Sequence, residues 1–469
     1  MIELVEKIKS DKLLQTVAEL AKPYDCYIVG GYIRDFLLGK TTYDVDLVVK
    51  RDFAKVLAEK ITAFFGAHFV ELDSENLIYR VVMPDKLHYF DISGMLDDDL
   101  KTDIDRRDLT INSIAFNLKT LEIVDLNDGL KDFRNRVLKS AKLSNFIDDS
   151  LRILRVFRFC AQTGFDIDPD VFNFVKSNVK LIENPAKERV CVELSKTFEG
   201  KYSLKALEKA DKAGLVDLIF PIMKEVKKIP PNSHHHLDLF HHLLESQAKI
   251  GEIFEKSNAQ VKEAVAPRLG LLKLAAFLHD IGKPSTWKID ENGRHRFITH
   301  DSVGAKLVRP ILADLKFSKK NINYIATLIK NHIYPSALLQ TDSSEKAKIR
   351  FFRKLGDFVP DVILLAQADR LCALGPAITQ ETVNSNISGL NSLLDFYLEN
   401  LDKVKLPEPL LNGHEISDLT KLPQSKELGD LVKEVRNLQL EGVLSTKDEA
   451  VKFVSEKVAK SRFLSDNRV

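Results

Sequence analysis

Two aspartates separated by one residue give the sequence its clearest chemical potential. Asp44 and Asp46 lie in the apolar segment 43–49, and in an extended strand both carboxylates would project from one face. Such carboxylates can hold divalent cations for phosphoryl transfer, one activating an attacking hydroxyl and the other binding a triphosphate. Asp91, in the strand-like segment 88–92, is expected to supply a third catalytic carboxylate. An Asp-x-Asp tripeptide alone is also typical of a solvated strand edge.

A glycine pair upstream favours phosphoryl transfer over the solvated edge. Gly30 and Gly31 follow an apolar run and precede Arg34 and Asp35. Because the glycines carry no side chain, their backbone N–H groups can approach a triphosphate closely, and a helix beginning there adds the positive end of its dipole. We therefore expect these four residues to bind a nucleotide.

A polar segment at residues 106–113 holds further candidates for nucleotide binding. In a helix, Asp108 and Asn112 would share one face at i,i+4, with Arg107 beside them. Such a face could read a ribose and clamp phosphates. The alternative interpretation is an ordinary charged helix N-terminus.

Arginines recur at every third position after Asp149, at Arg152, Arg155 and Arg158. Asp149 and Arg152 offer an acceptor and donors in one plane, which matches the edge of a nucleobase. The carboxylate would accept from N4 of cytosine or N6 of adenine, while the guanidinium donates to the ring acceptors; guanine and uracil present the wrong pattern. An ordinary i,i+3 ion pair is the alternative.

Taken in order, these motifs resemble those of class II tRNA nucleotidyltransferases, the CCA-adding and poly(A) polymerase family of the polymerase β superfamily. A further family motif falls on Glu188, Arg189, Glu193 and Leu194, so the resemblance covers roughly residues 20–200. It implies template-independent addition of C from CTP, and of A from ATP, to the 3′ end of tRNA, with release of pyrophosphate. It also implies that Asp44 and Asp46 hold Mg²⁺.

One segment departs from the family pattern. Members that add the whole CCA carry a flexible loop between the strand of the third carboxylate and the segment that corresponds to residues 106–113, whereas here only residues 92–105 intervene. By resemblance, this shortening is typical of enzymes that add CC and leave the final A to a separate A-adding enzyme, so CC addition is predicted. Full CCA addition and poly(A) polymerase activity are alternatives. Asp148 in place of Glu and Ser113 in place of Ala are milder departures.

A second candidate site begins in a histidine-rich segment, in which five histidines lie within residues 234–242. His279 and Asp280 lie in an apolar helical stretch, where an unpaired charge would be expensive to bury, so a metal is expected. The pattern resembles the HD superfamily of metal-dependent phosphohydrolases. The ligands that this resemblance implies are His241, His279, Asp280 and Asp369, with His300 and His332 as further ligands. Structural histidines are the alternative.

The donor set of this second site does not identify a single metal. Imidazole and carboxylate ligands without thiolates suit Mg²⁺, Mn²⁺, Ni²⁺ or Fe²⁺, and the sequence does not choose among them. The resemblance implies a phosphomonoesterase or 2′,3′-cyclic phosphodiesterase that trims damaged RNA ends, or a relic of one. A phosphohydrolase with a merely RNA-binding head, and an RNA-binding protein with a degenerate transferase site, are the rival functions; the intact Asp44 and Asp46 argue against both.

The elements that must position these residues predict an α+β chain. Short β-rich runs up to about residue 143 give way to helical periodicity. The resemblance implies a polymerase β-like head with a small sheet. The predicted division is a nucleotidyltransferase head at 1–140, an RNA-binding and base-templating helical neck and body at 141–229, an HD domain at 230–375 and a helical tail at 376–469.

Composition limits the setting in which the protein works. The formal net charge is +1, so a polyanion such as tRNA must be held by a local basic surface. Four dispersed cysteines without a C-x-x-C pair favour a reducing cytoplasm. No apolar run approaches the ~20 residues of a membrane span, and the N-terminus lacks a signal-peptide pattern, so no membrane partner is expected.

Overall fold

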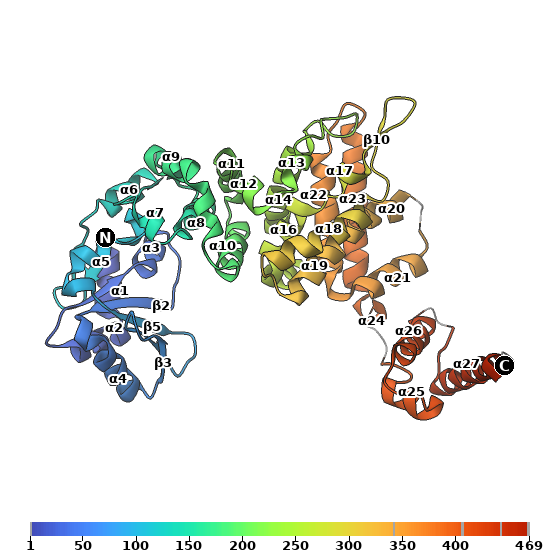
Figure 1. Cartoon of the computed structure of the whole chain (residues 1–469), viewed down its shortest axis with the longest axis horizontal. Helices are drawn as coiled ribbons and strands as arrows, with labels where there is room; N and C mark the ends of the chain where they lie inside the picture. The colour runs from blue at the N-terminus through green and yellow to red at the C-terminus, as the bar shows by residue number, and fades with distance from the viewer. Residues whose placement is uncertain (1, 341–342, 405–407, 441–442, 467–469) are drawn as a thin grey trace. The chain divides into compact units, whose positions relative to one another are not determined.

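The computed structural model describes residues 2–340, 343–404, 408–440 and 443–466 (Figure 1). Two compact units divide the chain, and each is discontinuous in sequence. The first contains Met1–Pro230, Leu237–Gly251 and Arg268–Ala326, and the second contains Pro231–His236, Glu252–Pro267 and Thr327–Val469. The mixed sheet lies in the first unit, which confirms the predicted α+β class with its N-terminal sheet. The four-part division of the chain stays a prediction.

A seven-stranded sheet forms the centre of the head, in the order β3-β4-β5-β2-β1-β6-β7. The strands are β1 (Cys26–Val29), β2 (Asp44–Val49), β3 (His68–Asp73), β4 (Ile78–Val82), β5 (Tyr89–Gly94), β6 (Ala115–Asn117) and β7 (Glu122–Val124). Only β2 and β5 pair in parallel; the other neighbours are antiparallel. Their Val- and Ile-rich sequences suit a pleated surface buried on at least one face.

The register of the central strands aligns the acidic residues. Asp46 lies opposite Val29 of β1 on one side and opposite Asp91 of β5 on the other. Arg80 of β4 lies opposite Asp91 in turn. Since side chains alternate along a strand, this register places Asp44, Asp46, Arg80 and Asp91 on one face of the sheet.

Four helices complete the head. They are α1 (Ile2–Ser10), α2 (Lys12–Ala21), α3 (Gly31–Leu37) and α4 (Ala54–Phe65). Asp11 caps α2 by accepting hydrogen bonds from two backbone N–H groups, and Gly66 ends α4 in the left-handed conformation. The helices and sheet share one apolar core in which Phe90 and Phe116 are fully buried. Each such side chain contributes roughly 1.5–3 kcal/mol through its burial.

Apart from β6 and β7, which complete the sheet of the head, the elements that follow β5 are mainly helices. The next elements are α5 (Leu100–Asp105), α6 (Gly129–Asn135), α7 (Asn145–Asp148), α8 (Arg152–Thr163), α9 (Pro169–Ser177), α10 (Lys187–Glu199), α11 (Ser203–Lys212), α12 (Leu215–Ile219) and α13 (Met223–Val226). Helix α8 packs against both α10 and α11, so the arginine-bearing helix is held from two sides. Two residues each of β8 (Val137–Leu138) and β9 (Asp166–Ile167) form a small parallel pair that the periodicity did not predict.

The histidine-rich part of the first unit is built on helices and one short hairpin. Its elements are α14 (Leu239–Lys256), α16 (Leu269–Leu278), α17 (Lys283–Thr286), β10 (Lys288–Ile289), β11 (His295–Arg296) and α18 (His300–Asp314). Helix α16 is buried along nearly its whole length, as its apolar sequence requires. Helix α19 (Lys319–Asn331) follows, at the point where the chain passes from the first unit to the second.

The regular elements described in the second unit are helices. Its elements include α15 (Ala259–Val265), α20 (Tyr334–Gln340), α21 (Glu345–Leu355), α22 (Val359–Cys372), α23 (Gln380–Glu399), α24 (Leu401–Val404), α25 (Gly413–Thr420), α26 (Lys426–Leu440) and α27 (Lys447–Asp466). The last three have a small apolar core of their own, which includes Leu411 and Ile416. Among the described residues, no helix is both long and apolar enough to cross a bilayer.

Candidate active site and metal centre

The structure brings the three predicted carboxylates of the head to neighbouring positions on β2 and β5. Asp44 is exposed and Asp46 is half-buried. Burial, together with the negative charges of Asp44 and Asp91, raises the pKa of Asp46 to about 6, although Arg107 opposes the shift. Burial and the charge of Asp91 raise the pKa of Asp44 as well. Negative charge gathered in this way fits a divalent cation, which would relieve the repulsion.

Gly30 lies directly against this acidic centre. Its φ is +73°, and a Cβ built there would lie 2.9 Å from Asp46 Oδ2 and 3.2 Å from Arg107 Nη1. Only glycine combines that backbone conformation with so close an approach. Gly31 begins α3, and its backbone N–H donates a hydrogen bond to Asp46. The glycine pair therefore allows the close approach of Asp46 to the start of α3 and helps to position its carboxylate.

Arg80 is a site residue that sequence reasoning missed. Its Nε and Nη2 donate to the two oxygens of Asp91, at 2.7 Å and 2.6 Å. This forked pair fixes the Asp91 carboxylate, which lies next to Asp46 in the sheet. A lone arginine in the otherwise apolar strand Ile78–Val82 was the available signal.

A chain of hydrogen bonds joins Arg34, which follows the glycine pair, to the segment at residues 106–113. Arg34 donates to Asn112 Oδ1 at 2.6 Å and also pairs with Asp35. Asn112 in turn donates to Asp108 Oδ1 at 2.9 Å, and Arg155 donates to Asp108 Oδ2 at 2.6 Å. Although burial alone would raise the pKa of Asp108, the charge of Arg155 and the bond from Asn112 hold that pKa below its usual value. Asp108 is therefore a buried anion that aligns donors from two motifs.

The predicted helix across residues 106–113 is wrong. Helix α5 ends at Asp105, Leu109 is extended, and Thr110–Asn112 forms a single 3₁₀ turn, η3. The side chain of Asp108 accepts from the backbone N–H of Leu109, which favours a turn over a continued helix. Asp108 and Asn112 still meet, because the turn brings their side chains together without an α-helical face.

Asp149 and Arg152 do not form the ordinary i,i+3 ion pair that was the alternative interpretation of this motif. Asp149 Oδ2 accepts a hydrogen bond from Arg189 at 3.0 Å, and Arg152 Nη1 donates to the carbonyl of Asn145 at 2.9 Å. No ion pair joins Asp149 to Arg152 in the described part of the chain. Asp149 has an extended backbone just before α8, so the i,i+3 geometry of a helix does not apply to the pair.

Glu193 of α10 anchors the other two arginines of α8. Arg158 Nη1 donates to Glu193 Oε1 at 3.1 Å, and Arg155 Nη1 lies 3.9 Å from the same oxygen. Burial and the nearby charge of Arg155 lower the pKa of Arg158 to about 10. The motif at residues 188–194, to which the sequence assigned no role, thus supplies the Glu193 carboxylate that holds the arginines of α8 and the Arg189 guanidinium that holds Asp149.

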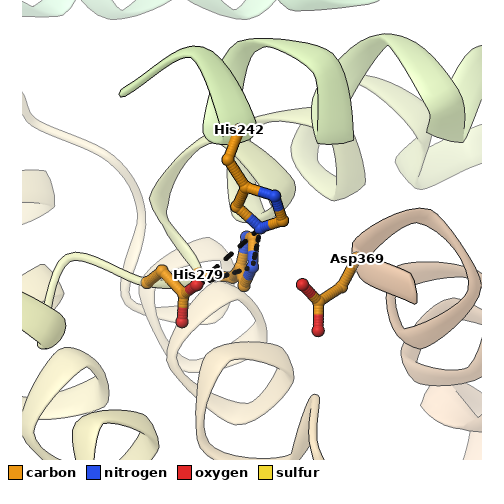
Figure 2. A group of neighbouring side chains, drawn as sticks. His242, His279 and Asp369 are labelled. Carbon is orange, nitrogen blue, oxygen red and sulfur yellow. Dashed lines mark hydrogen bonds and ion pairs between the residues drawn. The ribbon is translucent and has the colours of Figure 1, made fainter. Parts of the chain in front are cut away.

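A second cluster contains the side chains of His242, His279, Asp280 and Asp369, whose nearest ligand atoms lie within 4.8 Å of one another. Figure 2 shows His242, His279 and Asp369 pointing toward one another. Asp280, His300 and His332 form an overlapping group with the same spacing. These residues are the predicted ligands, with one exception.

The exception is the first histidine. His241, which was predicted as a ligand, is 59% exposed and its Nδ1 pairs with Asp238. His242 is fully buried, and its Nε2 lies 3.4 Å from His279 Nε2. Neighbouring residues of a helix point about 100° apart, so an error of one position assigns the ligand to a different face of α14. The ligand assignment is therefore corrected from His241 to His242.

The hydrogen bonds of three histidines fit a metal-binding role. Nδ1 of His279, His300 and His332 lies 2.7 Å from the carbonyl oxygen three residues earlier, of Ala276, Phe297 and Ile329 respectively. The ring nitrogen that donates to a carbonyl must carry the proton, which leaves the Nε2 lone pair for a metal. This repeated tautomer is the arrangement that a metal requires of imidazole ligands.

Lys283 adds a cation to the same cluster. Its buried ammonium lies 2.5 Å from Asp280 Oδ2. Burial alone would raise the pKa of Asp280, but the charges of Lys283, His279 and His300 hold it well below its usual value. Asp280 is therefore ionised and available as a hard oxygen ligand. Gly282 allows this packing, because a Cβ there would lie 2.1 Å from the carbonyl oxygen of His300.

Three family models match the chain in succession. The Poly A polymerase head domain matches residues 26–139, the probable RNA and SrmB-binding site of polymerase A matches residues 164–227, and the HD domain matches residues 239–374. The head-domain match contains Asp44, Asp46 and Asp91, and the HD-domain match contains the histidine cluster.

Full-length relatives and solved structures agree with these matches. A CC-adding tRNA nucleotidyltransferase of Thermus thermophilus is 30% identical over 92% of this chain and 93% of the relative. An A-adding tRNA nucleotidyltransferase of Deinococcus radiodurans is 29% identical over 92% of this chain and 95% of the relative. The fold resembles that of a Thermotoga maritima CCA-adding enzyme complexed with tRNA, with a TM-score of 0.56, 21% identity and coverage of 97% and 98% of the two chains. The chain is a nucleotidyltransferase and belongs to the class II tRNA nucleotidyltransferases of the CCA-adding and poly(A) polymerase family, with an HD domain.

Proposed function

We propose that this enzyme adds two cytidylates to the 3′ end of tRNA from CTP, releasing pyrophosphate at each addition. The observation that carries the proposal is the short connection after β5, which ends at Gly94, whereas α5 already begins at Leu100. This connection is tied down: Asp98 accepts a bond from the backbone of Arg51 at 2.6 Å, and Met95 donates to Val49 at 2.8 Å. A tethered turn of this length leaves no room for the flexible loop that switches a template from C to A.

The A-adding relative makes A addition the second candidate. Its 29% identity nearly equals the 30% of the CC-adding relative, so overall similarity does not separate the two activities. The short connection favours CC addition. On that proposal a separate A-adding enzyme completes the CCA end, and ATP is not incorporated by this chain.

Mg²⁺ is the proposed metal of the head, with Asp44 and Asp46 as its ligands and Asp91 as the third carboxylate. When bound there, it would supply charge neutralisation for the triphosphate and activation of the 3′-hydroxyl. The protein's own part is to gather the carboxylates on one sheet face and to hold Asp91 with Arg80. Backbone N–H groups at the start of α3 are proposed to bind the phosphates.

Base selection is proposed to lie with Asp149 and Arg152. Both side chains border the start of α8, and each is held by an anchor: Arg189 for Asp149 and the Asn145 carbonyl for Arg152. The geometry of the pair would form around the nucleobase, since the two side chains do not bind each other in the described structure. Arg107, Asp108 and Asn112, with Arg155 and Arg158, are proposed to position the nucleotide.

The histidine cluster is proposed as a separate metal centre. Its proposed ligands are His242, His279, Asp280 and Asp369, and Asp280 is shared with the overlapping group that contains His300 and His332. The buried imidazoles and ionised aspartate fit a divalent metal that would activate water for hydrolysis of phosphate at RNA ends. An RNA phosphohydrolase activity of the HD domain is the second function that this cluster supports.

Product length tests the main proposal. The purified protein and Mg²⁺ are incubated with tRNA ending at the discriminator base, using CTP alone, ATP alone or both, and with tRNA ending in CC and ATP. Addition of two residues with CTP, with or without ATP, is expected. Extension to CCA with both nucleotides would establish a full CCA-adding enzyme, and extension of only the CC-ending tRNA would establish an A-adding enzyme.

A further inference from the structure

Phe159 lies at the meeting point of three arginines from two parts of the site. Its ring is 1% exposed, and the guanidinium carbons of Arg34, Arg155 and Arg158 lie 4.8, 5.4 and 4.2 Å from the ring centroid. All three distances are within the range at which a cation is attracted to the negative face of an aromatic ring. Arg34 comes from α3 of the head, whereas the other two arginines share α8 with Phe159.

The three guanidinium groups repel one another and need a partner that separates them. Each is paired on its outer side with a carboxylate: Arg34 with Asp35, Arg155 with Asp108 and Arg158 with Glu193. The ring of Phe159 is contacted by all three guanidinium groups. An aliphatic side chain of similar size would fill the space without attracting the cations.

The hydrogen bonds around the ring connect the head to the arginine helix. Arg34 donates to Asn112, Asn112 donates to Asp108, and Arg155 also donates to Asp108. Arg34 and Arg155, the first and last residues of this chain of bonds, both lie over Phe159. The ring and the polar chain therefore hold α3, the turn at residues 110–112 and α8 in one arrangement.

We propose that Phe159 is a positioning residue that fixes the three arginines in the geometry that binds the incoming nucleotide. It acts through the guanidinium groups and does not touch the substrate itself. The inference rests on the proposed nucleotide-binding role of Arg34, Arg155 and Arg158. It assigns a function in catalysis to a buried phenylalanine that would otherwise count only as core.

Phe157 provides a matched control. It lies on the same helix, is 2% exposed, and has no guanidinium over its ring among the described contacts. Phe157→Leu and Phe159→Leu remove the same atoms from a buried position, so the loss of packing is comparable. A purely structural role predicts the same kinetic consequence for both variants.

The test compares steady-state CTP addition by Phe159→Leu, Phe157→Leu and Phe159→Tyr in the full chain, with melting temperatures measured in parallel. Phe159→Leu is expected to raise KM for CTP about tenfold, because the buried guanidinium groups lose their cation–π attraction to the ring. Little change in kcat is expected. Phe159→Tyr keeps the aromatic face, so its KM for CTP should stay close to that of the wild type. Phe157→Leu should lower the melting temperature to the same extent and leave KM within about twofold of wild type.

Equal KM values for Phe159→Leu and Phe157→Leu would overturn the inference, as would failure of Phe159→Tyr to differ from Phe159→Leu. If Phe159→Leu does not fold, Phe159→Met serves in its place with the same expected rise in KM. Absence of C addition by the wild-type enzyme would instead overturn the proposed function, so the two failures are distinguishable.

Discussion

The proposed transferase site and the histidine cluster both bring charged or titratable side chains together, but they differ in how far these side chains are exposed to solvent. Asp44 is exposed and Asp46 half-buried on an open sheet face, while the arginines nearby are already paired with protein carboxylates. In the cluster, His242 and His279 are 0% and Asp280 is 1% exposed. Solvent can stabilise the first site between substrates, whereas the second depends on groups inside the protein. An open site suits a large substrate such as tRNA, and a closed site suits a tightly held metal.

The largest expected effect comes from removing one carboxylate of the open site. Asp46→Asn should lower kcat for nucleotide addition on the order of 10³-fold, because a metal-binding carboxylate contributes several kcal/mol to transition-state stabilisation. Single-turnover addition of CTP to tRNA measures this effect. The melting temperature should stay the same or rise, since the substitution removes a charge that its neighbours disfavour. A kcat within tenfold of wild type would remove Asp46 from the proposed metal site.

The closed site should respond differently to loss of a ligand. His279→Ala is expected to abolish metal retention after dialysis, measured by elemental analysis, because one of the two imidazoles in the group of His242, His279, Asp280 and Asp369 is lost. Nucleotide addition should change less than about threefold if the two sites are independent. His241→Ala is the control and should retain the metal, because His241 is exposed. Retention by His279→Ala together with loss by His241→Ala would reverse the correction made to the ligand assignment.

A substitution at Asp108 tests whether the ion pair between Asp108 and Arg155 contributes to CTP binding. Asp108→Asn keeps the shape of the side chain but removes the charge that Arg155 binds. KM for CTP should rise about ten- to thirtyfold, the cost typical of a charge-assisted hydrogen bond of about 1.5–2 kcal/mol. Asp105→Asn is the control, since Asp105 pairs with Lys101 and Lys142. Similar KM values for the two variants would show that the Asp108–Arg155 pair is not needed.

The smallest expected effect concerns Arg80. Arg80→Lys keeps the positive charge but loses the forked contact with both oxygens of Asp91. The Mg²⁺ concentration that gives half-maximal activity should shift by about two- to fivefold, because Asp91 loses its fixed orientation while Asp44 and Asp46 are untouched. An unchanged Mg²⁺ dependence would make the pair a structural contact only.

Sequence patterns predicted the parts of both sites that depend on local geometry. The Asp-x-Asp spacing placed Asp44 and Asp46 correctly, because a strand projects alternate side chains from one face whatever its neighbours do. The same reasoning could not find Arg80, whose role depends on strand register between β4 and β5. Register is set by long-range pairing, which a single sequence does not reveal.

The errors have physical causes of the same kind. His241 and His242 are adjacent and chemically identical, so only the orientation of α14 decides which one is buried. The ordinary ion pair between Asp149 and Arg152, considered as an alternative, does not form, because Asp149 has an extended backbone and accepts a hydrogen bond from Arg189 of α10. The helix predicted at residues 106–113 gave way to a turn, because Asp108 binds its neighbouring backbone N–H.

The most direct test of the two-site account is nucleotide addition by three proteins on one tRNA ending at the discriminator base: wild type, Asp44→Ala and His279→Ala. Products are resolved at single-nucleotide length, and tRNA affinity is measured in the same samples. The account predicts two added cytidylates by wild type and His279→Ala, and none by Asp44→Ala despite unchanged tRNA affinity. Addition by Asp44→Ala at the wild-type rate, or its loss in His279→Ala, would contradict the account.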